Sequence, residues 1–177
     1  MKAVTFSYDD GVTQDIRLVE ILNRYNLKAT FNLNSELLGK GGSLDILGKR
    51  ISHNKINPSE VTSIYKGHEI AAHTLTHPDM TEMSADEVIR QVEQDRLNLS
   101  ELSGTEVIGM AYPGRQPNYN SRIARIIEDS TGVRYARTTI CSNDFSPQRD
   151  LYKFHPSAFH RDWEQLYKLA EKFVELD

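Results

Sequence analysis

Residues 4–11 read Val-Thr-Phe-Ser-Tyr-Asp-Asp-Gly, a β-branched and aromatic run that ends at two adjacent acids and a glycine. Such a run predicts a strand over 4–8, and the Asp-Asp-Gly triplet predicts the turn that ends it. We expect a helix next, capped by Thr13 or Asp15 and running to about Tyr25, because apolar residues recur there at helical spacing. A strand–turn–helix unit therefore opens the chain.

The same alternation of strand and helix continues along the sequence. Further strands are predicted at 29–33, 69–74, 107–112 and 135–140, with a weaker sixth at 153–159; helices are predicted at 58–65, at 84–102, from about 120 and from about 162. Residues 35–57 form a loop rich in glycine, and a long loop in a compact domain is often functional or mobile. Strict alternation predicts a parallel α/β sheet with helical crossovers, either an open doubly wound sheet or a barrel.

The amino-acid composition is typical of a single folded globular domain. The 177 residues are close to the roughly 150 residues of one domain, and 38% are hydrophobic. The 21 basic and 25 acidic residues give a net charge of −4, which argues against a dedicated nucleic-acid binder. The single cysteine, Cys141, excludes an intramolecular disulfide and a thiolate-rich zinc site. No run approaches the ~18 apolar residues of a membrane span.

The first residues show no secretory signal peptide. The start of the chain, MKAVTFSYDDG, lacks the apolar stretch and cleavage site of a secretory signal peptide. A lone cysteine also fits a reducing compartment. From the chain as written we expect a cytoplasmic protein.

Polar residues follow the first and third predicted strands, and in either architecture chemistry lies at the carboxyl ends of strands. Asp9 and Asp10 can supply a cation ligand and a proton acceptor, although Asp-Gly alone is also a common turn dipeptide. His73 and His77 can reach one ion across a strand-to-turn bend, or can be two unrelated histidines. Together, aspartate and two histidines suit Zn²⁺ or another divalent transition metal with open positions for water and substrate.

These motifs resemble those of the polysaccharide deacetylases with a NodB homology domain, which belong to the carbohydrate esterase family 4 type. Thr-Phe-Ser-Tyr-Asp-Asp-Gly at 5–11 looks like the first family motif, and His-Thr-Leu-Thr-His at 73–77 like the second. Ala-Tyr-Pro-Gly at 111–114 looks like a variant of the third. The resemblance covers residues 4 to about 113 and implies a distorted parallel (β/α) barrel.

The resemblance also implies a role for each residue. Asp9 matches the general base, and Asp10, His73 and His77 match the ligands of a divalent metal ion, zinc first, with cobalt or nickel as alternatives. Gly114 falls where the family uses a backbone N–H to stabilise an oxyanion. The implied reaction is metal-dependent removal of acetyl groups from an N-acetyl amino sugar polymer or an acetylated polysaccharide.

Two family features are missing from the sequence. Ala111 stands where the family has an arginine that orients the base, which leaves Arg115 as a guess for that role. The final strand, with the histidine that acts as general acid, is not found; His155 and His160 could line the site but do not match that motif. We therefore expect residues 1–177 to be a single deacetylase domain, incomplete at its C-terminal end and lacking its last strand, with a second copy covering the open barrel edge. The alternative is a non-catalytic relative that binds metal or glycan.

Overall fold

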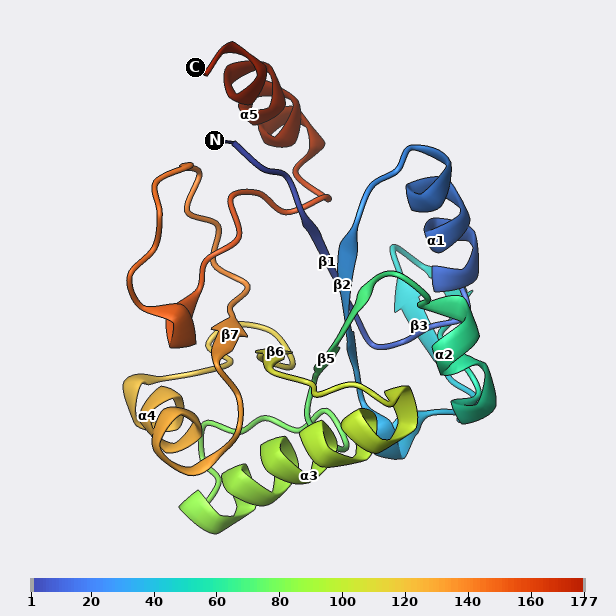
Figure 1. The fold of residues 1–177 in the computed structure, drawn as a ribbon, viewed down its shortest axis with the longest axis vertical. Coiled ribbons are helices and arrows are strands. Elements are labelled where there is room, and N and C mark those ends of the chain that lie inside the picture. The colour runs from blue at the N-terminus through green and yellow to red at the C-terminus, as the bar shows by residue number, and fades with distance from the viewer. Residues whose placement is uncertain (1, 177) are drawn as a thin grey trace.

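Parallel strands form a curled sheet at the centre of the molecule (Figure 1). The structure is a computed structural model and describes residues 2–176. Within that range the sheet has five strands in the order β1–β2–β5–β6–β7, and every neighbouring pair is parallel. Their bounds are Phe6–Asp9, Ala29–Leu33, Glu69–Ala72, Gly109–Ala111 and Tyr135–Arg137. The arrangement confirms the predicted distorted (β/α) barrel, and no closing strand occurs among the described residues.

Helices surround the outside of the sheet, except for α5, which stands apart beside the N-terminal end of the chain (Figure 1). Their apolar faces supply the core, which is why the sequence shows helical spacing there. Ser84 caps a helix as predicted, since its hydroxyl accepts the N–H of Glu87, and Gly104 follows the last residue of that helix. The helix bounds are Asp15–Arg24 (α1), Val61–Ile64 (α2), Ala85–Ser103 (α3), Ser121–Ser130 (α4) and Trp163–Glu175 (α5).

Strand β2 lies at the centre of the core. All five of its residues are buried, as expected for a parallel strand that is covered on both faces. The Phe31 ring packs on the ring of Tyr65 at 4.6 Å between centroids, and the Tyr65 hydroxyl donates to Asp15 at 2.7 Å. Asp15 is therefore a buried residue within the first turn of α1; the helix follows Gln14, so neither Thr13 nor Asp15 is its cap.

Residues 39–57, which we call the strap, contain a β-hairpin where the sequence predicted an irregular loop. Strands β3 (Ser43–Ile46) and β4 (Lys49–Ser52) pair antiparallel. The two residues that join them, Leu47 and Gly48, have φ values of 51° and 74°, as the favoured two-residue hairpin turn requires. The strap therefore has defined structure.

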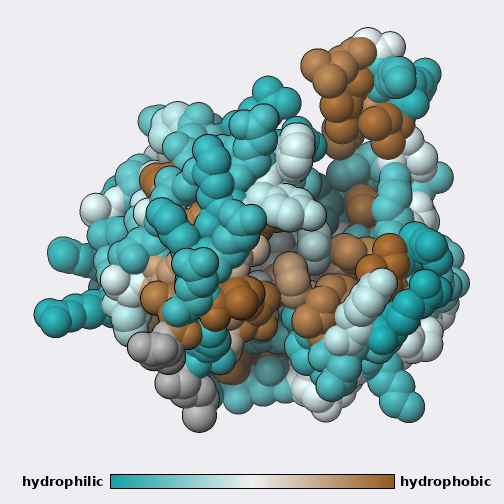
Figure 2. Space-filling model, turned by 90° about the horizontal axis from the view of Figure 1, so that it is seen from above, coloured by the Kyte–Doolittle hydropathy of each residue, from teal (hydrophilic) through white to brown (hydrophobic). Residues whose placement is uncertain are grey.

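The C-terminal region departs from the sequence prediction. Residues 153–159 are not a strand, because Leu151–Lys153 form a 3₁₀ turn and Phe154 makes only an isolated parallel bridge to Arg137. Figure 2 looks onto the end of the molecule where α5 and both termini lie, and shows apolar groups at several places on a largely hydrophilic surface. On α5 the exposed apolar side chains include Trp163 and Val174. Covering of the open barrel edge by a second copy stays a prediction. None of the described helices is both long and apolar enough to cross a membrane.

Candidate active site

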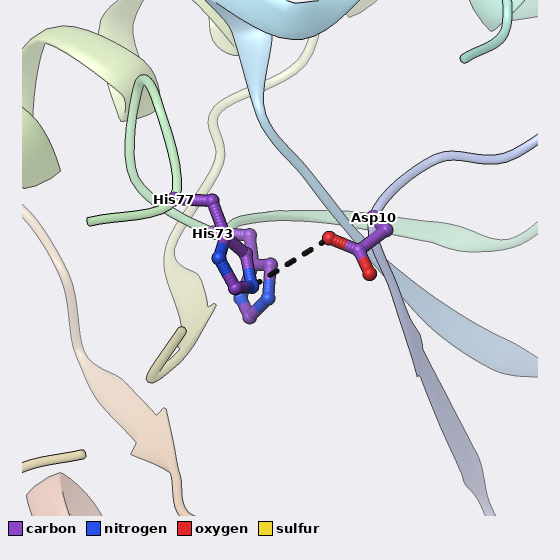
Figure 3. Close-up of side chains that lie close together, drawn as sticks. All are labelled: Asp10, His73 and His77. Carbon is purple, nitrogen blue, oxygen red and sulfur yellow. Dashed lines mark ion pairs between the residues drawn. The ribbon is translucent and has the colours of Figure 1, made fainter. Parts of the chain in front are cut away.

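The ends of β1 and β5 bring three side chains to one point (Figure 3). One ligand atom from each of Asp10, His73 and His77 lies within 4.8 Å of the other two. His77 Nε2 is 3.7 Å from Asp10 Oδ1, and the two imidazole centroids are 4.9 Å apart. The three residues predicted as ligands are therefore assembled, with the two nitrogens and one oxygen that suit zinc.

Left-handed backbone conformations shape this site. Six described residues other than glycine have positive φ, and three of them are Asp10 (81°), Thr74 (68°) and His77 (58°). Such conformations cost free energy and persist where the surroundings enforce them, often at functional sites. Within a strand, the neighbouring carboxylates of Asp9 and Asp10 would point to opposite faces of the sheet. The turn at Asp10 ends the strand, so this rule no longer separates them. The next residue, Gly11, has φ 60° and no room for a Cβ, which would lie 2.9 Å from Leu33.

The His73 ring is fixed in the tautomer that a metal ligand needs. Its Nδ1 lies 2.9 Å from the carbonyl oxygen of Ala111, so Nδ1 carries the proton and Nε2 keeps a free lone pair. Burial lowers the pKa of His73, which also favours the neutral ring. This second interaction is typical of metal-bound histidines, so the residues present fit a metal ion.

Buried polar groups hold the backbone at His73. Its N–H donates to Asp95 Oδ2 at 2.9 Å, and the Asn34 side-chain amide donates to its carbonyl at 2.6 Å. Asp95 Oδ1 also accepts the N–H of Ser35 at 2.7 Å, while burial raises the pKa of Asp95 to about 7. The sequence analysis did not find these supporting residues, because each is a single polar residue within an otherwise ordinary helix or turn.

Asp9, the last residue of β1, lies beside this cluster as an ionised carboxylate. Burial favours its neutral form, but the Arg137 guanidinium and the Asn32 amide hold the pKa of Asp9 below its ordinary value. Asn32 Nδ2 donates to Asp9 Oδ1 at 2.9 Å, and Arg137 pairs with the same oxygen. Both contacts fall on Oδ1, which leaves Oδ2 available as a proton acceptor.

Arg137 supplies the guanidinium that the sequence analysis sought in Arg115. Arg115 is exposed, whereas Arg137 ends β7 and also donates to the Ser7 hydroxyl at 2.9 Å. The expectation that Arg115 orients the base is therefore wrong, and Arg137 is the arginine that contacts Asp9. The sequence carried no clear signal for Arg137, because the fifth strand was predicted over 135–140 and Arg137 ends the strand only in the structure.

The remaining predicted residues lie around the same cluster. The N–H of Gly114 lies at the site, where it donates to His77 Nε2 at 3.3 Å. His155 Nδ1 lies 2.6 Å from the Thr138 hydroxyl oxygen. The His160 ring lies 6.4 Å from that of Tyr8, the residue before the base in β1, and burial lowers the pKa of His160.

Two cationic or titratable side chains from the strap also reach Asp10. Lys55 Nζ is 3.3 Å from Asp10 Oδ1, and His53 Nε2 is 3.4 Å from Oδ2. The sequence analysis named neither residue. The only signal was the length of the loop that carries them.

In sequence, the chain is similar to polysaccharide deacetylases. The family model described as polysaccharide deacetylase matches residues 1–136. A bifunctional xylanase/deacetylase from Pseudobutyrivibrio xylanivorans is 26% identical over 107 residues, which cover 60% of this chain. The match spans only 15% of that relative's length.

Solved structures share the fold at low sequence identity. The Streptococcus pyogenes deacetylase PplD in complex with acetate has a TM-score of 0.71 at 20% identity, with 96% of this chain and 71% of that chain covered. IcaB from Ammonifex degensii has a TM-score of 0.74 at 13% identity, with 93% and 71% covered. Since the family model matches well over half of the 177 residues, the chain belongs to the polysaccharide deacetylase family.

Proposed function

We propose that the chain is a metal-dependent hydrolase that removes acetyl groups from a carbohydrate, either an N-acetyl amino sugar polymer or an acetylated polysaccharide. The observation that carries this proposal is the meeting of Asp10, His73 and His77 beside the ionised Asp9. Membership of the family supports carbohydrate deacetylation. The donor set supports a divalent ion, zinc before cobalt or nickel.

The three ligands each have a defined part. His73 and His77 would bind the ion through imidazole nitrogen, with His73 offering Nε2, and Asp10 through a carboxylate oxygen. When bound, such an ion polarises a carbonyl group and lowers the pKa of water at the site.

Asp9 is the proposed general base. Its Oδ1 is engaged by Asn32 and Arg137, so Oδ2 is the oxygen that takes the proton from the attacking water. The N–H of Gly114 donates to His77 Nε2; once that nitrogen holds the ion, the N–H would be free to donate to the acetyl oxygen as negative charge develops there. Each group acts from a fixed backbone position at a strand end.

We further propose that His160, rather than His155, protonates the leaving group. His155 uses Nδ1 on the Thr138 hydroxyl, whereas His160 lies beside Tyr8, the neighbour of the base in β1. The substrate would then lie between Asp9 and His160.

Acetate release is the direct test. The chain is stripped of metal, supplied with zinc, cobalt or nickel, and assayed on acetylated chitooligosaccharides and xylooligosaccharides, with Asp9→Asn as the inactive control. Release of acetate by the unaltered chain alone supports the proposal and identifies the substrate class. If the chain binds zinc but releases no acetate from any substrate, the non-catalytic metal- or glycan-binding relative is the better description.

A further inference from the structure

The strap places a lysine on the oxygen of Asp10 that faces the histidines. Lys55 Nζ is 3.3 Å from Asp10 Oδ1, and the same Oδ1 is 3.7 Å from His77 Nε2. Any ion held between the histidines and Asp10 would thus share its carboxylate oxygen with an ammonium group. Two positive charges at one oxygen repel each other, and the repulsion is stronger where water is excluded.

The backbone fixes Lys55 on both sides. Its neighbours pair with the turn that follows Asp10: the N–H of Ile56 donates to the carbonyl of Gly11 at 2.9 Å, and the N–H of Thr13 donates to that of Asn54 at 2.8 Å. Ile56 is only 1% exposed and anchors the strap in the core. Lys55 is therefore not a surface lysine that rests on the site by chance.

The ammonium group is also largely shielded from solvent. The Lys55 side chain is 8% exposed, and its second partner is His53 Nε2 at 3.2 Å. Since an ammonium group can only donate, His53 Nε2 accepts this hydrogen bond. A buried ammonium group needs a charged partner, and Asp10 is the carboxylate within ion-pair distance among the described residues.

We propose that Lys55 is a resident counter-cation of Asp10, which competes with the divalent ion and so weakens the affinity of the site for metal. This inference rests on the metal site of the proposed function. Without metal, the lysine neutralises the Asp10 carboxylate and stabilises the turn that carries it. With metal bound, the lysine opposes the ion, so the strap sets how readily the ion exchanges.

Zinc affinity, measured by calorimetry on the full chain, tests the inference. Lys55→Met removes the charge at similar volume, and we expect its dissociation constant for zinc to fall about tenfold or more. Lys49→Met is the matched control, since Lys49 is exposed on β4 of the same strap, and we expect its affinity to equal that of the unaltered chain. In EDTA, Lys55→Met is expected to melt at a lower temperature, and to gain more from added zinc, because Asp10 has lost its partner.

A second variant guards against misfolding. Lys55→Gln retains a hydrogen-bond donor without the charge, and we expect it to bind zinc more tightly as well. Unchanged or weaker zinc binding in the folded variants overturns the inference and leaves Lys55 as a positioning residue for Asp10. If the unaltered chain binds no divalent ion, the proposed metal site itself fails, which is a different result from equal binding by all the variants.

Discussion

The two halves of the sheet differ in how their strands are paired and in which residues they bring to the site. The register joins four residue pairs between β1 and β2 and four between β2 and β5, but only one, Ala72 with Met110, between β5 and β6. The well-paired half ends in the acid pair and the histidine pair. The other half contributes the N–H of Gly114 and the guanidinium of Arg137.

The proposed metal ligands therefore come from one half of the sheet, and the groups that act on the base or on the substrate come from the other. Ligands of a metal ion must hold their geometry closely, so they belong on the more firmly paired strands. Groups that tune a charge tolerate a looser position. Four substitutions test this division.

Loss of the base is expected to have the largest effect. Asp9→Asn removes the proton acceptor, and we expect turnover of an acetylated oligosaccharide to fall about a thousandfold. Zinc affinity measured by calorimetry should stay nearly unchanged, because Asp9 is not among the proposed ligands. Asp45→Asn, on exposed β3, is the control. If Asp9→Asn lost zinc affinity as well as turnover, Asp9 would be a metal ligand and not only the general base.

The firmly paired half also contains a pH-sensitive carboxyl. Burial raises the pKa of Asp15 to about 6, so Asp15 stabilises the fold below about pH 4 and this stabilisation is lost as the pH rises through 6. Asp15→Asn can still accept the bond from Tyr65. We expect equal unfolding free energies at pH 4 and an advantage for the variant of up to roughly 3 kcal/mol at pH 8. Denaturant titrations in EDTA measure this; parallel pH curves for the two proteins would contradict it.

The segment after β7 is tested through its histidines. We expect His160→Gln to reduce turnover by about a hundredfold, since it removes the proposed proton donor, and to leave zinc affinity unchanged. His155→Gln serves as the matched control in steady-state assays. A larger loss in His155→Gln would reassign the acid and place it on the Thr138 side of the site.

Arg137 gives the smallest expected change in rate. Arg137→Met is expected to lower turnover by roughly ten- to a hundredfold, as is usual for groups that orient a catalytic residue. It also removes a charge that holds the pKa of Asp9 down, so the acid limb of the pH–rate profile should move to higher pH. Arg134→Met is the control, since Arg134 is exposed and directly precedes β7. An unchanged acid limb would show that Arg137 does not act on the base.

The sequence allowed the site to be predicted where its chemistry is local. Each pair, Asp9 with Asp10 and His73 with His77, lies within a few residues at the end of a strand, and parallel topology brings those ends together. The fold followed from the alternation of apolar strands with amphipathic helices. Both inferences use only short-range pattern and a general rule of topology.

The supporting cations could not be predicted in the same way. Arg137 is 128 residues from Asp9, and only the three-dimensional structure brings the two together. The hairpin of the strap also gave no alternating pattern, because almost every residue of β3 and β4 is exposed. Its turn is Leu47-Gly48 rather than the usual Asn-Gly, which removes the other common signal.

The hydrogen bond from His73 to Ala111 spans the junction where the sheet is most thinly paired. An ion bound to Nε2 of that ring would fix its orientation and so stabilise the hydrogen bond that joins His73, after β5, to Ala111 in β6. The free energy of metal binding then adds to the free energy needed to separate β5 from β6 by local unfolding. Amide hydrogen exchange in β6 would therefore report metal occupancy, even though this strand supplies none of the proposed ligands.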